Sequence, residues 1–320
     1  MMIRVLLSFL ISFFCVYLHS KTVIHAGYLF NSNNGNIEPE MTIYIENERI
    51  SEVIEGYVNP ELEDEFIDLT GYYVLPGLID MHVHLTNQSS NRAYLERVTL
   101  NSADYAIRAT KNAEKTLIAG FTTVRNLGDS SSVTISLRNA INQEIIPGPR
   151  IFTSGKTISS TGGHGDPTNS LNEELTKDLG PDDGVINGEV DAFKAVRSRY
   201  KENADLIKIT ATGGVLSNAK DGQNPQLTTE EITAVVKAAR DYGFKVAAHA
   251  HGAEGIKRAT NAGVDSIEHG TLMDSEGAEM MRQKGTYYVP TLLAGKWVAD
   301  KALIKDYYPP FVEKKALEIG

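Results

Sequence analysis

The sequence predicts an α/β protein organised around a (β/α)8, TIM-like barrel, with a small β-domain in front of it. From residue 74 onward, short apolar segments rich in β-branched residues alternate with amphipathic helical segments. That alternation is typical of parallel βαβ units. Histidines and other polar side chains stand where the strands are expected to end, which favours a barrel over a doubly wound sheet.

The composition is that of an ordinary folded protein. Of the 320 residues, 42% are hydrophobic and 22% are charged, which is ample material for a core. The formal net charge of -10 weighs against binding to nucleic acid or to anionic membranes. The single cysteine, Cys15, lies in an N-terminal apolar run, so we expect no disulfide and no thiol chemistry after that run.

Residues 1–20 are expected to form a signal peptide. Arg4 precedes an apolar run at residues 5–18, which is short for a membrane-spanning helix. Leu18 is bulky where a small residue usually precedes the cut after Ser20, so an uncleaved membrane anchor is the alternative. We therefore expect an exported, periplasmic protein that meets the membrane only through this segment.

Residues 21–73 are expected to form the N-terminal part of a small β-domain, interpreted as an incomplete β-sandwich. Segments 22–30 and 41–56 have the alternation of antiparallel strands, with an Asn-rich turn between them. Asn47 and Glu48 are predicted to form a hairpin tip. His25 is interpreted as a half-exposed sheet residue and not as a metal ligand.

Residues 74–320 are expected to form the barrel, and seven of its strands can be placed. We place them at residues 74–85, 121–129, 149–159, 204–214, 244–252, 263–270 and 286–293. Helical spacing of apolar residues places helices at residues 92–119, 133–141, 191–203, 229–242, 253–262, 275–284 and 296–318. Thr228 and Glu231 form a capping box. No eighth strand follows, so we expect the sequence to be a fragment of a longer protein.

Six histidines fall at predicted strand ends or in a Gly-rich segment after the third strand. They are His82, His84, His164, His249, His251 and His269. Histidines scattered by chance would also fall on helices. Because the carboxyl ends of parallel barrel strands meet at one mouth, we expect these side chains to lie together. Neutral imidazoles are common metal ligands, so the pattern predicts a metal site.

Lys208 is expected to point into the barrel. It alternates on the fourth strand with Ile207 and Ile209, whose apolar side chains would face the surrounding helices. Burial lowers the pKa of a lysine amine, and a neutral amine can add carbon dioxide to form a carbamate. The two oxygens of that carbamate could bridge two cations. The alternative is a structural lysine paired with a barrel carboxylate.

Other residues are expected near the site in supporting roles. Asp80 shares a strand face with the paired histidines and is predicted to support the site, not to bind metal. Arg125 and Asp129 lie near the end of the second strand and are predicted to support it as well. Tyr287 and Tyr288 fit the core or the rim as well as a substrate contact.

These motifs together resemble the metal-dependent amidohydrolase superfamily, and most closely its imidazolonepropionase-like, Xaa-Pro dipeptidase-like branch. The segments that carry the resemblance are LPGLIDMHVHL, STGGHGD, ADLIKITATGG, AAHAHG and GVDSIEHGT. The resemblance implies two divalent cations, with zinc as the expected metal. It places His82 and His84 on one cation and His249 and His269 on the other, with a carbamate of Lys208 between them.

The resemblance also implies a hydrolase of amide and peptide C–N bonds that uses a metal-activated water. A dipeptidase for Xaa-Pro or related dipeptides is expected, with His164 at the developing oxyanion and His251 in contact with substrate. A cyclic amide of the imidazolone type is an alternative substrate, and a non-catalytic metal- or ligand-binding barrel is an alternative of another class. The proton-transferring aspartate of strand eight is absent from these residues. Whether the protein forms a homo-oligomer is left open.

Overall fold

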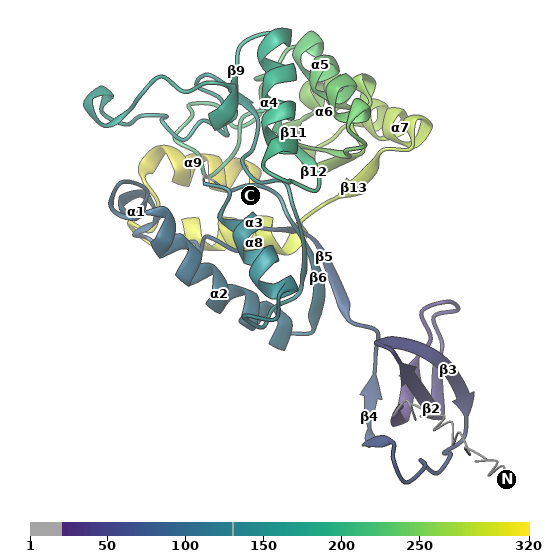
Figure 1. The fold of residues 1–320 in the computed structure, drawn as a ribbon. Helices are drawn as coiled ribbons and strands as arrows, with labels where there is room; N and C mark the ends of the chain where they lie inside the picture. The colour runs from purple at the N-terminus through teal and green to yellow at the C-terminus, as the bar shows by residue number, and fades with distance from the viewer. Residues whose placement is uncertain (1–20, 130) are drawn as a thin grey trace, which may run out of the picture. The chain divides into compact units, whose positions relative to one another are not determined.

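A computed structural model of the chain describes residues 21–129 and 131–320, and the predicted signal peptide lies outside this range (Figure 1). The chain divides into two compact units, of which the first ends at Pro76 and the second covers Gly77–Gly320. Across the described residues, none of the helices combines the length and the apolar character needed to cross a membrane.

The smaller unit contains one mixed four-stranded sheet with the strand order β3-β2-β1-β4. Its strands are β1 (Thr22–Phe30), β2 (Ile37–Glu46), β3 (Arg49–Glu55) and β4 (Glu65–Val74). The predicted hairpin tip is present, because Glu46 pairs with Arg49 and both tip residues have a positive φ. The antiparallel expectation for this sheet is wrong in one respect, because β4, where no strand was predicted, pairs in parallel with β1. That pairing depends on a long connection and has no local signal.

His25 differs from its expected exposure. Its ring is buried between strands, stacks on Tyr57, and makes a 2.8 Å hydrogen bond from Nε2 to the Val58 carbonyl. The side chain therefore has a structural role in the smaller unit.

The larger unit is built on parallel strands in chain order. A three-stranded sheet contains β5 (Leu78–Val83), β6 (Phe121–Asn126) and β7 (Arg150–Thr153). A four-stranded sheet contains β10 (Ile207–Thr210), β11 (Val246–Gly252), β12 (Ser266–Leu272) and β13 (Tyr287–Val289). Ile158 joins the two sheets through a parallel bridge to Ile209. The seven predicted strands therefore form, and a small pair, β8 (Ser159–Ser160) and β9 (Val185–Ile186), accompanies them.

The helices follow the predicted order, with two of the expected helices divided. They are α1 (Ala93–Thr99), α2 (Ser102–Ile118), α3 (Val133–Asn142), α4 (Glu189–Lys201), α5 (Thr229–Asp241), α6 (Ala253–Ala262), α7 (Ser275–Lys284), α8 (Leu292–Ala302) and α9 (Pro310–Ile319). The break before α2 occurs where the Asn101 N–H donates to the Asp104 carboxylate at 2.8 Å. The break before α9 lies at Pro309, because proline cannot continue a helix from the preceding turn.

The main core lies between β10, β11 and the helices α4, α5 and α6 (Figure 1). Ile207 and Ile209 are fully buried in it, as expected for the helix-facing side of β10. The capping box of α5 is present, since Glu231 N–H donates to the Thr228 hydroxyl and Thr228 N–H donates to the Glu231 carboxylate. This packing fixes the strand ends that carry the histidines.

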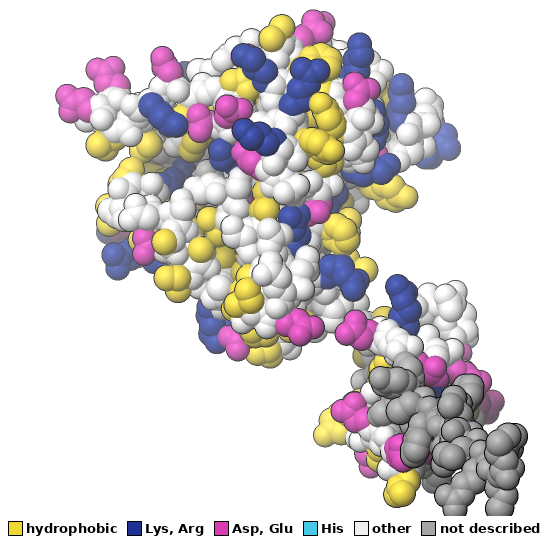
Figure 2. Space-filling view, in the orientation of Figure 1, with side chains coloured by type: hydrophobic (Ala, Val, Ile, Leu, Met, Phe, Trp, Pro, Cys, Tyr) yellow, Lys and Arg dark blue, Asp and Glu magenta, His cyan; other side chains and the backbone are white. Residues whose placement is uncertain are grey.

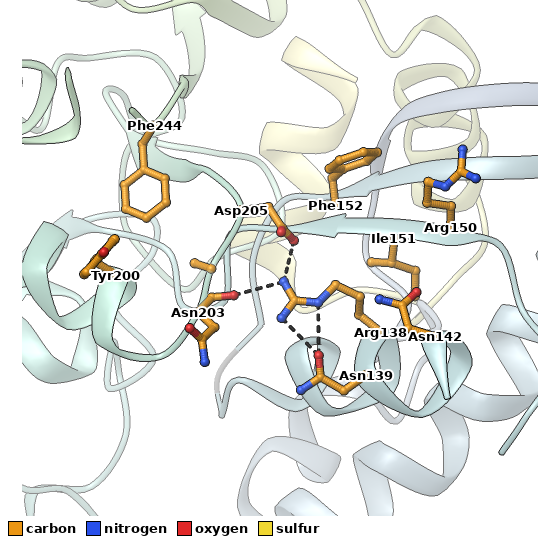
Figure 3. Close-up of a pocket in the computed structure, with 11 residues that line it drawn as sticks. Arg138, Asn139, Asn142, Arg150, Ile151, Phe152, Tyr200, Asn203, Asp205 and Phe244 are labelled. Carbon is orange, nitrogen blue, oxygen red and sulfur yellow. Dashed lines mark hydrogen bonds and ion pairs between the residues drawn. The ribbon is translucent and has the colours of Figure 1, made fainter. Parts of the chain in front are cut away.

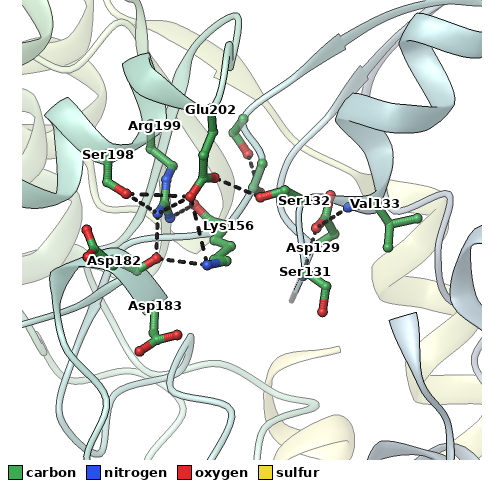
Figure 4. Close-up of polar contacts among 12 residues, drawn as sticks. Asp129, Ser131, Ser132, Val133, Lys156, Asp182, Asp183, Ser198, Arg199 and Glu202 are labelled. Carbon is green, nitrogen blue, oxygen red and sulfur yellow. Dashed lines mark hydrogen bonds and ion pairs between the residues drawn. The ribbon is translucent and has the colours of Figure 1, made fainter. Parts of the chain in front are cut away.

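A buried arginine anchors the Gly-rich segment at 161–188. Arg199 of α4 donates to the carbonyls of Lys156 at 3.3 Å and Asp182 at 2.7 Å, and it pairs with Glu202 (Figure 4). Arg199 thus ties α4 to Asp182 inside the segment and to Lys156 ahead of it. On the surface, Figure 2 shows acidic and basic side chains interspersed over the visible face of the larger unit, without a broad basic area.

Candidate active site

The six histidines singled out in the sequence lie together in the larger unit. His82 and His84 lie at the C-terminal end of β5, His249 and His251 on β11, His269 on β12, and His164 in the loop after β8. Ring centroids are 5.3 Å apart for His82–His84, 4.8 Å for His82–His269, 4.7 Å for His249–His269 and 4.3 Å for His164–His249. His251 lies 4.7 Å from His249 and 5.0 Å from His269.

His82 and His84 are held in one tautomer by their acceptors. The Nδ1–H of His82 donates to the Glu268 carboxylate at 3.0 Å, and the Nδ1–H of His84 donates to the Gly128 carbonyl at 3.2 Å. Carboxylate and carbonyl oxygens accept hydrogen bonds, so each Nδ1 carries the proton. Burial, together with the charge of Lys208, lowers the pKa of both imidazoles. Each neutral ring therefore keeps its lone pair on Nε2.

The two Nε2 atoms lie 3.3 Å apart. Two lone pairs at that distance repel each other unless a cation or a proton lies between them. In a tetrahedral zinc site with Zn–N bonds of about 2.0–2.1 Å, two nitrogens are separated by about 3.3–3.4 Å. The spacing and the chemistry of this pair therefore fit two ligands of one metal ion.

His249 and His269 are also neutral imidazoles with defined partners. The Nε2–H of His249 donates to the Gly213 carbonyl at 2.8 Å, which leaves the lone pair on Nδ1. His269 shares a 2.7 Å hydrogen bond between Nδ1 and the Thr291 hydroxyl. Burial lowers the pKa of both rings well below the usual value, with further lowering from neighbouring histidines and Lys208. Both side chains can therefore donate an electron pair to a cation at neutral pH.

An unusual backbone conformation brings His269 into the site. Ser266 and Glu268 share one face of β12, so regular alternation would turn His269 to the opposite face. His269 instead has a φ of 71°, in the left-handed region that non-glycine residues rarely adopt. The Tyr288 hydroxyl donates to the His269 carbonyl at 2.9 Å and braces this turn. Tyr288 thus supports the site from the backbone side.

Lys208 lies beside the histidine cluster, as predicted. It is 3% exposed, and burial lowers its pKa to about 8, with Glu268 opposing the shift and Arg125 adding to it. Its positive charge in turn contributes to the lowered pKa of His82, His84, His249, His251 and His269. Among the described residues Lys208 forms no salt bridge, although the charge of Glu268 favours its protonated form.

His164 and His251 complete the cluster. The backbone N–H of His164 donates to the Gln226 side chain at 2.7 Å, and its ring stacks on His249. Its buried Nδ1 has no hydrogen-bond partner in the described part of the chain. His251 shares a 3.0 Å hydrogen bond from Nδ1 with the Thr271 hydroxyl, and burial lowers its pKa to about 4. Burial also lowers the pKa of His164 well below its usual value, so both rings are neutral neighbours of His249.

The sequence did not identify Glu268, which is a central residue of the site. It is fully buried and pairs with Arg125, whose Nη2 lies 2.6 Å from Oε1. The local signal was a glutamate inside an apolar strand directly before a candidate ligand. Asp80 lies nearby and accepts a 2.9 Å hydrogen bond from the backbone N–H of His82, which agrees with a supporting position.

Asp129 makes a helix-capping contact that was not predicted. Its carboxylate accepts from the backbone N–H of Val133 at 3.1 Å (Figure 4). It also accepts from the backbone N–H of Thr134 at 3.0 Å and from the Thr134 hydroxyl. These are donors of the first turn of α3, so Asp129 caps that helix. The charge of Asp129 also opposes the lowering of the His84 pKa by burial.

Outside this cluster, two cavities lie away from the predicted site residues. One of about 540 Å³ is lined by Arg138, Phe152 and Tyr200 among others, near the N-terminal ends of β7 and β10 (Figure 3). Another of about 380 Å³ lies between the 220–224 segment and α9. Within residues 21–129 and 131–320, no three His, Cys, Asp or Glu side chains converge to hold one metal ion. The histidines therefore offer pairs of ligands, and further donors are needed.

The fold and the histidine-lined strand ends define the class of the protein. The amidohydrolase family pattern matches residues 73–307, and the chain belongs to this family. Members of the family are typically metal-dependent. The parallel strands correspond to part of the TIM barrel that such proteins contain.

Several proteins of known structure or activity are similar to this chain. A crystal structure of a Xaa-Pro dipeptidase with bound methionine in the active site is 51% identical, with a TM-score of 0.90, over 94% of this chain and 74% of that one. A prolidase complexed with N-methylphosphonate-L-proline is 33% identical, with a TM-score of 0.82, over 94% and 73%. Ochratoxinase from Aspergillus niger is 31% identical over 230 residues, which are 68% of this chain and 47% of the relative. The chain thus spans about half the length of this curated relative.

Proposed function

We propose that the protein is a metal-dependent dipeptidase that cleaves the C–N bond before a C-terminal proline or a related residue. The observation that carries the proposal is the pair of neutral imidazoles, His82 and His84, with Nε2 atoms 3.3 Å apart. The likeness to a Xaa-Pro dipeptidase and to a prolidase supports the choice of substrate.

His82 and His84 would hold one divalent cation and His249 and His269 a second, with zinc as the expected metal. When bound, the cations would lower the pKa of a water molecule and polarise the scissile carbonyl. The chain's own residues keep the four imidazoles neutral and oriented. Burial lowers each pKa, and acceptors such as the Gly213 carbonyl decide which ring nitrogen carries the proton.

Lys208 is proposed to supply the missing donors as a carbamate. Its amine nitrogen would form a bond to the carbon of carbon dioxide and release one proton to solvent. The lowered pKa of about 8 supports this step. At pH 7 roughly a tenth of such an amine is neutral, against roughly one part in three thousand for an ordinary lysine. The carbamate would then supply anionic oxygen donors beside the two imidazole pairs.

His164 and His251 are proposed to contact the substrate. The buried Nδ1 of His164 is free of partners in the described residues, so it can hydrogen-bond the carbonyl oxygen as negative charge develops there. His251 is oriented by the Thr271 hydroxyl and stays neutral, because its pKa is lowered to about 4. It can thus hold a polar group of the substrate next to His249.

A further parallel strand is proposed between β13 and β5, which would complete a (β/α)8 barrel. In the described part of the chain, β5 pairs only with β6 and β13 pairs only with β12. Ile79 on β5 and Tyr287 on β13 have exposed side chains, which such a strand and its helix would cover. We propose that this strand carries the aspartate that accepts the proton of the attacking water.

Metal analysis together with a substrate screen tests the proposed function. We expect about two zinc ions per chain and hydrolysis of Xaa-Pro dipeptides in preference to cyclic amides. Hydrolysis of cyclic amides alone would support the imidazolone-type alternative. Bound metal without any turnover would support a binding barrel and would contradict the enzyme proposal.

Lys208→Ala tests the carbamate, and Lys201→Ala, at an exposed position at the end of α4, is the matched control. Only the first variant is expected to lose metal and hydrolysis. Labelled bicarbonate should also give a carbamate carbon signal by NMR in the wild type and none in Lys208→Ala. A wild type without this signal would contradict the carbamate.

We propose that the protein is exported, on the basis of residues 1–20, which lie outside the described structure. Cell fractionation with mass spectrometry of the mature N-terminus tests it. Material found outside the cytoplasm with an N-terminus near Lys21 supports a cleaved signal, membrane-bound material with an intact leader supports the anchor, and cytoplasmic material contradicts export.

A further inference from the structure

Glu268 receives three hydrogen bonds in the interior of the larger unit. Its Oε1 accepts from Arg125 Nη2 at 2.6 Å and from the Ser266 hydroxyl at 2.6 Å, while its Oε2 accepts from His82 Nδ1 at 3.0 Å. The Glu268 side chain is 0% exposed and that of His82 is 7% exposed. One oxygen of the carboxylate is thus committed to its supporting residues, and the other is left for the imidazole.

Arg125 connects this carboxylate to the strand that carries His82. In addition to its contact with Glu268, its Nε donates to the Met81 carbonyl at 2.7 Å, one residue before His82. Arg125 also donates from Nη1 to the Ser266 hydroxyl at 3.1 Å. The arginine therefore ties β6 to both β5 and β12, which belong to different sheets. The position of the carboxylate relative to the His82 backbone is set by this bridge.

We propose that Glu268, held by Arg125 and Ser266, is a positioning residue that fixes His82 in the Nδ1–H tautomer and aims its Nε2 lone pair at the neighbouring His84. Without a strong acceptor at Nδ1, a neutral imidazole can carry its proton on either nitrogen, and a proton on Nε2 removes the electron pair that a cation needs. The consequence for cation binding rests on the proposed function, whereas the tautomer itself does not.

A single substitution can reverse the hydrogen-bond polarity at this position. Glu268→Gln keeps the shape of the side chain, and its amide oxygen can still accept from Arg125 and Ser266. The amide nitrogen then faces His82, so it donates to Nδ1 where the carboxylate accepted. The proton of the neutral ring is expected to move to Nε2. Asp80→Asn is the matched control, because Asp80 accepts from the backbone N–H of His82 and not from its ring.

The experiment measures the tautomer directly in metal-free protein. Nitrogen-15 NMR of histidine-labelled wild type, assigned with His82→Gln, should show Nδ1 of His82 protonated and Nε2 unprotonated near neutral pH. Asp80→Asn should give the same pattern, and Glu268→Gln the opposite one. If His82 of the wild type carries its proton on Nε2, the inference is overturned, whether or not Glu268→Gln folds. An unchanged tautomer in a folded Glu268→Gln would overturn it as well.

Zinc affinity, measured by competition with a chelating dye, separates this inference from the proposed function. Glu268→Gln is expected to bind about 10- to 100-fold more weakly than the wild type, and Asp80→Asn about equally. A wild type that shows the Nδ1–H tautomer but binds no metal contradicts the proposed function and leaves the positioning role intact. Equal zinc affinities of the wild type and of Glu268→Gln would contradict the positioning role.

Discussion

Lys315 should stabilise a loop that lies against the histidine cluster. This lysine of α9 is 5% exposed, and its ammonium donates to three backbone carbonyls, those of Gly214 and Ser217 at 2.9 Å and of Ala219 at 2.8 Å. The same loop includes Gly213, whose carbonyl accepts from the ring of His249. Replacing Lys315 by methionine keeps the apolar stem and leaves these carbonyls without their donor.

The size of the effect follows from these three contacts. A hydrogen bond from a charged donor contributes roughly 1.5–3 kcal/mol, but burying the ammonium offsets a large part of the sum. That offset appears as a pKa that burial lowers from the usual 10.5 to about 8. We expect Lys315→Met to lower the free energy of unfolding by about 2–4 kcal/mol. Urea denaturation measures it, and hydrogen exchange of the 213–222 segment should accelerate in the variant.

Lys314→Met is the control, because the neighbouring Lys314 has a 75% exposed side chain and pairs only loosely with Glu318 at 3.8 Å. The pH dependence has a definite sign. Between about 8 and 10.5 the unfolded chain holds the Lys315 proton and the folded chain does not, so the wild type should gain stability relative to Lys315→Met as pH rises through this window. Equal stability of the two variants at pH 7 would refute the reasoning.

Two further substitutions test the supporting structure. Asp129→Ala should lower the free energy of unfolding by about 1–2 kcal/mol, because α3 loses its cap, while Ser131→Ala, at an exposed position, should be neutral in the same urea titration. A neutral Asp129→Ala would contradict the capping role. Gly213→Ala would place a Cβ 2.1 Å from the Asp221 carbonyl oxygen, so the loop must move and with it the acceptor of His249. We expect reduced zinc content in this variant but not in Gly180→Ala, where the added Cβ meets open space; equal zinc content would argue against the link.

The sequence was sufficient for those parts of the site that depend on strand periodicity. Residues two apart on a strand share a face, and this rule correctly separates Lys208, whose charge acts on the histidines, from Ile207 and Ile209 in the main core. Strand ends of parallel units meet at one edge, which is why histidines from β5, β11 and β12 could be expected together. Their clustering in the structure confirms this expectation, while their roles as ligands stay predictions.

Contacts between distant segments could not be predicted from the sequence. The hydrogen bond between His82 and Glu268 joins residues 186 positions apart, and no periodicity connects them. The parallel pairing of β4 with β1 depends on tertiary structure in the same way. By contrast, the cap at Asp129 and the helix break at Asn101 did have local signals, because aspartate and asparagine before a helical segment are typical caps. The helix break at Asn101 was not predicted, because the apolar periodicity continues across residues 92–119.

The backbone conformation of His269 has a consequence for selecting stable variants. A non-glycine residue in the left-handed region costs roughly 1–2 kcal/mol, and glycine at the same position does not. Exchange of this histidine for glycine would therefore relax the backbone while it deletes an imidazole from the cluster. A variant chosen only to relieve backbone strain here would lose part of the site, and the loss of the buried ring with its hydrogen bond to Thr291 opposes the gain in stability.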